Sequence, residues 1–302
     1  MYWNGNKNSK GGEVMKRIGF IGLGVMGNSM AGHLLAAGHP LFVYTRTKEK
    51  AESLLERGAV WVDTPGELTK LVDVIITMIG YPTDVEEVYL GENGILANGE
   101  ANLVAIDMTT SSPSLAKKIY DAAKVKGISI LDAPVSGGDI GAQTAKLSIM
   151  VGGDEQTFVS MKPLFECMGT QVVYQGLAGS GQHTKMANQI ALAGAMIGVC
   201  EAIVYAEKAG LDPAVVLKSI SSGAAGSWAM SNLASRMLAG DFAPGFYIKH
   251  YIKDMTIALA EAEKMGILTP GLRTVKQMYE ALAKSGREND GTQALYTYWD
   301  RS

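Results

Sequence analysis

Residues 17–27 read RIGFIGLGVMG, an apolar run that ends in a glycine-rich turn. The run is typical of a buried strand, and a helical pattern follows it. Gly22 permits a tight turn, Gly24 lets the backbone approach a pyrophosphate, and Gly27 lets helix and strand pack closely. The N–H groups of the new helix would then face the phosphates. The stretch predicts a dinucleotide-binding βα unit, with a purely structural turn as the alternative.

Beyond this turn, short β-branched runs alternate with helical patterns, which is typical of βαβ units and a parallel sheet. After residue 181 the pattern is helical alone. The sequence predicts an α/β fold, in which a long helix joins an N-terminal doubly wound Rossmann sheet to a C-terminal all-helical domain. The strands are expected at residues 17–21, 41–44, 74–78, 103–107, 129–132, 147–151 and 172–174. Helices are expected at residues 27–37, 48–57 and 112–126, and then at 183–209, 213–221, 228–238, 251–265 and 270–284.

The domain division follows from the same change in pattern. Residues 1–14 are polar and glycine-rich, lack the apolar core of a secretory signal, and are expected to form a flexible extension. An NADP-binding Rossmann domain is expected over residues 15–178, and an all-helical substrate and oligomerisation domain over 179–302. Residues 186–205 are nearly long enough to span a bilayer, but Asn188, Gln189 and Glu201 favour a buried helix of a soluble protein. Cytoplasm is the expected location, with no membrane partner.

Composition argues against several functional classes. With 302 residues, 47% of them hydrophobic, the chain can bury a substantial core, so a disordered protein is not expected. A net charge of −3 gives no reason to expect a nucleic-acid partner. Cys167 and Cys200 stand outside any CxxC spacing and are expected to be small buried residues. The four histidines show no metal-ligand spacing, so no metal is predicted.

The residues after the second expected strand bear on the choice of cofactor. NAD-binding proteins usually carry an acidic residue there for the ribose 2′-hydroxyl, whereas this chain has Thr45, Arg46 and Thr47. The Arg46 guanidinium can hold a 2′-phosphate, and the two threonines can donate hydrogen bonds. NADP is therefore the expected cofactor, with NAD as the second choice. A solvated surface arginine is the alternative interpretation.

Lys185 is the candidate proton-transfer group, because no GxSxG, HExxH or paired-carboxylate arrangement is present. A dehydrogenase needs a group that exchanges the alcohol proton as hydride moves, and a partly buried lysine with a lowered pKa can do this. Lys185 stands near the start of the long apolar helix, just past the domain boundary, and Asn188 shares its helix face. From spacing alone, an ordinary surface lysine remains the alternative.

Two further polar stretches follow expected strands. Residues 136–138, Ser-Gly-Gly, come after the fifth strand, and Thr109 and Thr110 come after the fourth. Ligands of open α/β sheets bind outside the carboxyl ends of the strands. The Ser136 hydroxyl and the N–H groups beyond it are therefore placed to hold an anion such as a substrate carboxylate. A tight turn would have the same sequence.

Four motifs in order resemble the β-hydroxyacid dehydrogenase family, which includes 3-hydroxyisobutyrate dehydrogenases, tartronate semialdehyde reductases and glyoxylate/succinic semialdehyde reductases. They are GLGVMG from residue 22, DAPVSGGDIGA from 132, GSGQHTKMAN from 179 and KDMTIALAEAEKMGI from 253. The resemblance covers the chain from about residue 16 to its C-terminus. It implies a Rossmann domain, a helical domain that usually forms homodimers or homotetramers, and a small carboxylate-bearing substrate.

The resemblance also implies roles for individual residues. The family's catalytic lysine falls on Lys185 and its substrate-orienting asparagine on Asn188. The substrate-binding residues are then Ser136, Gly137, Gly138 and Asp254. The cofactor-binding residues are then Gly22, Leu23, Gly24, Val25, Met26, Gly27, Thr45, Arg46, Thr47, Met78, Ile79, Gly80, Thr109, Thr110 and Lys253.

The expected reaction moves hydride between NADP(H) and a small 3-hydroxy acid or its semialdehyde, with Lys185 exchanging the proton. The sequence departs from the family at Gln189, where a second asparagine is usual, and at Ala145, where glycine is common. The first departure could alter hydrogen bonding and substrate choice. Three alternatives are open: an imine reductase of the same fold, which usually replaces the lysine; a 6-phosphogluconate dehydrogenase, which would be longer and richer in cations; and a non-catalytic binding or assembly module, which would lose the lysine.

Overall fold

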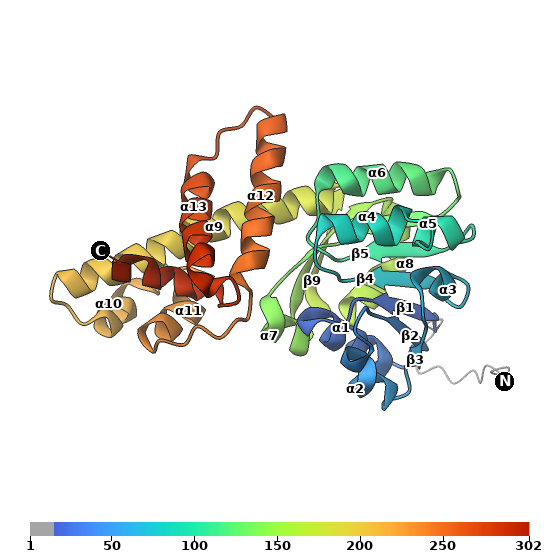
Figure 1. The fold of residues 1–302 in the computed structure, drawn as a ribbon, viewed down its shortest axis with the longest axis horizontal. Coiled ribbons are helices and arrows are strands. Elements are labelled where there is room, and N and C mark those ends of the chain that lie inside the picture. The colour runs from blue at the N-terminus through green and yellow to red at the C-terminus, as the bar shows by residue number, and fades with distance from the viewer. Residues whose placement is uncertain (1–14, 302) are drawn as a thin grey trace.

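A nine-stranded sheet forms the N-terminal half of residues 15–301, the part of the chain that the computed structural model describes (Figure 1). The flexible extension expected over residues 1–14 lies outside the described residues. The strands are β1 (Ile18–Ile21), β2 (Leu41–Tyr44), β3 (Val60–Trp61), β4 (Val74–Thr77), β5 (Val104–Asp107), β6 (Ser129–Asp132), β7 (Val135–Ser136), β8 (Leu147–Gly153) and β9 (Gly169–Gly176). Their order is β3-β2-β1-β4-β5-β6-β8-β7, and β9 pairs with β8.

Strands β1 to β6 are parallel, so their carboxyl ends meet at one edge of the sheet. Ile21, at the end of β1, lies opposite both Tyr44 and Thr77, and Asp107 lies opposite Asp132. The predicted parallel arrangement does not extend to β8, which is antiparallel to β6 and β7. The connection from β7 to β8 covers only residues 137–146, which is shorter than a parallel crossover needs.

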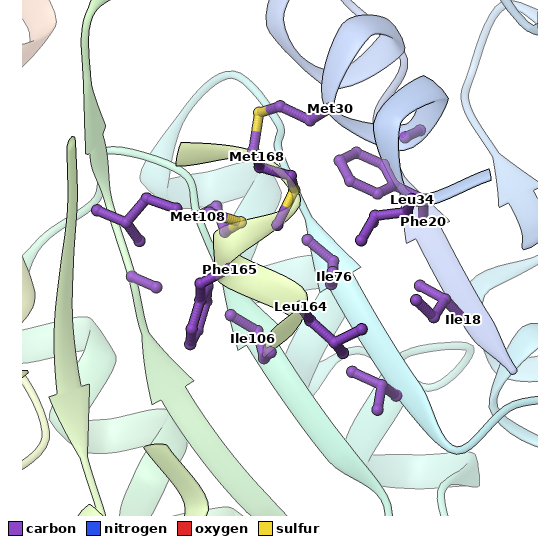
Figure 2. Close-up of a cluster of buried hydrophobic side chains, with 14 of the residues drawn as sticks. Ile18, Phe20, Met30, Leu34, Ile76, Ile106, Met108, Leu164, Phe165 and Met168 are labelled. Carbon is purple, nitrogen blue, oxygen red and sulfur yellow. The ribbon is translucent and has the colours of Figure 1, made fainter. Parts of the chain in front are cut away.

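Helices cover both faces of the sheet, because successive residues of a strand point to opposite sides. Ile18 and Phe20 of β1 belong to one core, whereas Ile21 belongs to the other. Figure 2 shows the first core, to which α1 (Val25–Ala36) contributes Met30 and Leu34 and α8 (Glu155–Glu166) contributes Leu164 and Phe165. The other helices of this half are η1 (Lys48–Ala51), α2 (Glu52–Leu55), α3 (Pro65–Thr69), α4 (Pro82–Leu90), α5 (Ile95–Asn98), α6 (Pro113–Lys124) and α7 (Gly138–Gln143).

The C-terminal half is helical, and no strand follows β9 within the described residues, as predicted. It comprises α9 (Ser180–Lys208), α10 (Pro213–Ile220), α11 (Trp228–Leu238), α12 (Ile248–Lys264), α13 (Pro270–Leu282), η2 (Ala283–Arg287) and η3 (Thr292–Arg301). Figure 1 shows α9 running from the sheet into the helical half, where it packs with α11, α12 and α13. The predicted fold class is confirmed. The division at residues 178 and 179 stays a prediction.

α9 is long and apolar enough to cross a membrane by length and composition. Its apolar residues Met196, Val199 and Cys200 nevertheless form the centre of the helical core. Its polar residues Lys185 and Gln189 are also buried by protein. One face of the helix therefore packs in the core, and 39% of its most apolar 18-residue stretch is buried.

Candidate active site

A cleft of about 1570 Å³ lies between the carboxyl-end edge of the sheet and helices α9, α11 and α12. It brings together residues that are as far apart in the sequence as Gly22 and Asp254. Every residue predicted from the sequence for the cofactor, the substrate or catalysis lines this cleft, except Thr109. The sheet contributes the loops after its strands, and the helical half contributes side chains of α9 and α12.

The glycine turn after β1 has the geometry of a phosphate cradle. Gly22 has φ +96°, and a Cβ atom on it would lie 2.3 Å from the Met78 carbonyl oxygen. A Cβ on Gly27 would lie 1.9 Å from the Gly22 carbonyl oxygen, whereas one on Gly24 would meet nothing within 4 Å. The first turn of α1 has no side-chain cap, so its N–H groups are left for a ligand. The turn therefore fits a dinucleotide pyrophosphate.

Arg46 lies at the end of the cleft that a cofactor ribose would reach, between Thr45 and Thr47. Its guanidinium forms an ion pair of 3.2 Å with Asp84 at the start of α4, and its side chain is 77% exposed. The recorded hydrogen bond uses one nitrogen only, Nη1. The remaining N–H groups can bind an anion, so this arrangement is compatible with a 2′-phosphate.

The loops after β4 and β5 are held by hydrogen bonds of Thr109 and Lys253. The Ile79 N–H donates to the Thr109 hydroxyl at 3.0 Å, and the Thr109 N–H donates to Asp107 Oδ1 at 3.0 Å. Thr109 is only 1% exposed, which explains why it supports the neighbouring loop and does not line the cleft. Lys253 of α12 donates to the carbonyl oxygens of Gly80 (3.1 Å) and Thr110 (2.7 Å), so it joins the helical half to both loops.

The first turn of α9 is fixed to the sheet by Asp132. Its carboxylate oxygens accept hydrogen bonds from the N–H groups of Gly179 (2.8 Å) and Gln182 (2.9 Å). The Gln182 side chain in turn donates to the Thr109 carbonyl and accepts from the Ser111 N–H. Burial raises the pKa of Asp132 to about 6, and these N–H groups oppose the rise. The sequence prediction missed this attachment, although Asp132 and Gln182 both belong to its quoted motifs.

Lys185 follows one turn later on α9 and faces the cleft, with 7% of its surface exposed. Burial lowers the pKa of its amine from 10.5 to about 8, because desolvation disfavours the charged form. The Asp254 carboxylate opposes this shift, and the Lys253 ammonium adds to it. A lysine with such a pKa can hold and release a proton near neutral pH. The structure therefore places the predicted proton-transfer residue in an environment suited to that chemistry.

Asn188 lines the same cleft and is hydrogen-bonded to a residue that was not among the predicted site residues. Its Nδ2 donates to Gln189 Oε1 at 2.8 Å, and Gln189 Nε2 donates to Asp254 Oδ2 at 2.6 Å. Asp254 is 2% exposed, and its Oδ1 lies 3.1 Å from Lys253 Nζ. The departure from the family motif at Gln189 was the only sequence signal for this chain of contacts.

The loop at residues 136–138 lies across the cleft, with Ser136 ending β7 and Gly138 beginning α7. Gly137 and Gly138 have φ values of +130° and +64°, which favour glycine. A Cβ on Gly138 would meet nothing within 4 Å, so a ligand can approach the backbone closely. Lys146 and Ser148 line the cleft as well. The arrangement can receive a small anion.

Two family models match consecutive parts of the chain. Residues 17–176 match the NAD binding domain of 6-phosphogluconate dehydrogenase. Residues 179–299 match the model described as NAD-binding of NADP-dependent 3-hydroxyisobutyrate dehydrogenase. Together they support a nicotinamide cofactor in the cleft.

Relatives and solved structures agree with these models. The chain is 64% identical to an uncharacterized oxidoreductase of Bacillus subtilis over 286 residues, which cover 95% of this chain and 99% of that protein. It is 40% identical to 2-hydroxy-3-oxopropionate reductase of Escherichia coli, with 89% and 92% covered. The solved 3-hydroxyisobutyrate dehydrogenase of Mycobacterium tuberculosis with L-serine is 30% identical, with a TM-score of 0.87 and 95% and 99% covered. The chain therefore belongs to the β-hydroxyacid dehydrogenase family and is a nicotinamide-dependent oxidoreductase of the 3-hydroxyacid dehydrogenase type.

Proposed function

We propose that the protein interconverts a small 3-hydroxy acid and its semialdehyde with NADP(H), and that Lys185 transfers the proton. The observation that carries the proposal is the buried Lys185 amine, whose pKa is lowered to about 8, in the cleft that also holds the dinucleotide turn. The Asp254 carboxylate, which lines the same cleft, is already bound to Gln189 and paired with Lys253.

A reduced nicotinamide bound in the cleft supplies the hydride that reaches the carbonyl carbon. In the direction of reduction, the Lys185 ammonium donates a proton to the carbonyl oxygen as negative charge develops on it. The products are the alcohol, the oxidised cofactor and a neutral lysine, which recovers a proton from solvent. Oxidation reverses each transfer. Asn188 lies on the same face of α9 and is placed to orient the reacting group.

The loop at residues 136–138 supports a substrate with a carboxylate a few bonds from its carbonyl. Open backbone at Gly138 and the Ser136 hydroxyl can accept one small anion. Binding at this remote group would orient the carbonyl, so its loss should lower kcat as well as affinity. The relative named 2-hydroxy-3-oxopropionate reductase and the structural neighbour solved with L-serine favour the same class of small hydroxy or amino acid.

NADP is the proposed cofactor because Arg46 replaces the usual acidic residue and keeps N–H groups free for a phosphate. The description of the C-terminal family model, which refers to an NADP-dependent dehydrogenase, points the same way. A homodimeric or homotetrameric assembly and a cytoplasmic location stay predictions.

The test is a panel of small semialdehydes and hydroxy acids, each assayed with NADPH and NADH or their oxidised forms. Succinic semialdehyde, glyoxylate, and methylmalonate and tartronate semialdehydes are compared with uncharged aldehydes of equal length. Lys185→Met should lower turnover by about two to four orders of magnitude, because general acid catalysis supplies about that factor. Lys208→Met, at the exposed C-terminal end of the same helix, is the matched control. Equal kcat/KM for butyraldehyde and succinic semialdehyde would remove the carboxylate site from the proposal.

A further inference from the structure

We propose that Gln189 is a positioning residue: its side-chain amide, oriented by the Asp254 carboxylate, fixes which atoms of Asn188 face the substrate. The proposal rests on the proposed function, in which Asn188 orients the reacting group. It also gives a role to the position where this sequence departs from the asparagine that is usual in the family.

The contacts of Gln189 hold it from several sides. Its side chain is 1% exposed and bridges α9 to α12, because its Nε2 donates to Asp254 Oδ2 at 2.6 Å. Its Oε1 accepts from Asn188 Nδ2 at 2.8 Å, and its main-chain carbonyl accepts from the Tyr251 hydroxyl at 3.1 Å. Tyr251 is fully buried, so this hydrogen bond is shielded from water. Within the described part of the chain, residues 15–301, Asn188 and Asp254 form no direct hydrogen bond with each other. Both are hydrogen-bonded to the Gln189 side chain.

The direction of these hydrogen bonds is set by charge. A carboxylate has acceptors only, so Asp254 requires the NH2 group of Gln189 to face it. The Gln189 side-chain oxygen must then face Asn188, whose NH2 group donates a hydrogen bond to it. Asn188 is left with its carbonyl oxygen and one N–H for the cleft that it lines. A neutral partner at position 254 would allow both amides to turn over, and Asn188 would no longer have one fixed orientation.

The length of the side chain at position 189 matters for the same reason. Asparagine is one methylene shorter than glutamine, so it would withdraw the amide from Asp254 by about 1.5 Å. The 2.6 Å contact would then be too long for a hydrogen bond. The other oxygen of Asp254, Oδ1, already accepts no hydrogen bond from the described residues, although Lys253 lies 3.1 Å away. Loss of the Gln189 contact would leave the buried Asp254 carboxylate without its hydrogen bond, and the orientation of the Asn188 amide would no longer be fixed.

A length-compensating double variant tests this bridge. Gln189→Asn and Gln189→Met should each lower kcat for semialdehyde reduction about tenfold to a hundredfold, since orientation of the reacting group is lost. Asp254→Glu lengthens the partner by one methylene, so Gln189→Asn combined with Asp254→Glu should recover most of the kcat that Gln189→Asn loses. Each variant is assayed well below its melting temperature, with NADPH affinity measured as a control. If Gln189→Met does not fold, the asparagine variant and the double variant still decide the question.

The dependence of kcat on pH distinguishes a positioning role of Gln189 from an effect of Gln189 on the pKa of Lys185. Asp254 raises the pKa of Lys185, so Asp254→Asn should move the midpoint of the profile to lower pH. Gln189→Met should lower kcat and leave the midpoint in place, because Gln189 carries no charge. A midpoint that moves with Gln189→Met would show that Gln189 acts on the lysine, and would overturn the proposal.

Two other results would contradict it as well. The first is wild-type kcat in Gln189→Met together with a large loss in Asn188→Ala. The second is a double variant that is worse than either single change, which would show that position 189 only fills space. In both cases turnover would still depend on Lys185, so the proposed function would stand. If the wild-type enzyme reduces no semialdehyde, or if Lys185→Met keeps full activity, the proposed function itself fails.

Discussion

Varying the pH from about 6 to about 10 in both reaction directions probes Lys185 without changing any residue. Its pKa is lowered from 10.5 to about 8 by burial, with Lys253 adding to the shift and Asp254 opposing it. This difference corresponds to about 3 kcal/mol between the charged and neutral forms. The protonated fraction should therefore fall from about 90% at pH 7 to about 10% at pH 9. Between these values, kcat/KM for reduction should decrease about ninefold, and kcat/KM for oxidation should increase by about the same factor.

The assay follows the absorbance of the reduced cofactor at each pH, with cofactor saturating and substrate well below KM. His250 also lines the cleft, but burial lowers its pKa below 6.5, so its titration belongs to the acid side of the profile. Profiles with no midpoint below pH 10 would mean that the lysine behaves as a solvated surface residue, whose ordinary pKa is 10.5. Profiles that persist unchanged in Lys185→Met would show that another group carries the proton, and either result refutes the reasoning.

Four substitutions extend these tests. Arg46→Ala should weaken NADPH binding about tenfold to a hundredfold and NADH binding far less, since a charge-assisted hydrogen bond contributes about 1.5–3 kcal/mol. The affinities for both cofactors are measured by titration, with Arg17→Ala, before β1, as the control variant. An equal loss of affinity for NADPH and NADH would contradict this prediction. Burial raises the pKa of Asp107 to about 6, so the folded state takes up a proton before the unfolded state does as the pH falls. Asp107→Asn should therefore be more stable than the wild type above pH 6 by about 2–3 kcal/mol, and this advantage should vanish toward pH 4; urea unfolding at pH 5 and pH 8 checks the sign. Gly24→Ala should keep the melting temperature, because its Cβ enters open space, and should lose cofactor affinity, because that space is where the pyrophosphate approaches the backbone. Gly27→Ala should destabilise the fold by at least about 1–3 kcal/mol, because its Cβ would lie 1.9 Å from the Gly22 carbonyl oxygen. Calorimetry and cofactor titration are carried out on both variants, and the same behaviour in both would contradict the prediction.

Strongly periodic segments were predicted well from the sequence. The strands expected at residues 41–44 and 129–132 and the helix expected at 228–238 have the observed bounds. The two-residue strands β3 and β7 were missed, because two residues are too few to show a period. The antiparallel course of β8 was missed as well, since its cause is the short connection after β7 and not its own composition.

At the site, the sequence indicated which residues gather but not how they are connected. The cleft contains the predicted turn, lysine and Ser-Gly-Gly loop because strand ends and the start of the long helix must meet there. The bonds of Asp132 to α9, and of Gln189 to Asp254, join positions 47 to 65 residues apart. Such pairings depend on the tertiary fold, so no local pattern reports them. Thr109 shows the same limit, because its burial and its hydrogen bond with the Ile79 N–H depend on the tertiary fold.

The attachment of the first turn of α9 to Asp132 has a consequence for recombining this protein with its relatives. A Cβ on Gly181 would lie 2.4 Å from the Met150 carbonyl oxygen and 2.5 Å from that of Asp132, so this turn is seated in the sheet edge. The position of Lys185, one turn later, is therefore set by contacts with the sheet, although this residue follows the change from strands to helices in the sequence. A chimera joined at residue 179 would seat a foreign helix end on this edge and displace the lysine. With a crossover further along α9, past Gln189, Lys185 and the first turns of the helix would stay with the sheet of this chain, and the rest of the helical half would come from the relative. The relative's α12 would then have to supply a hydrogen-bond partner for Gln189.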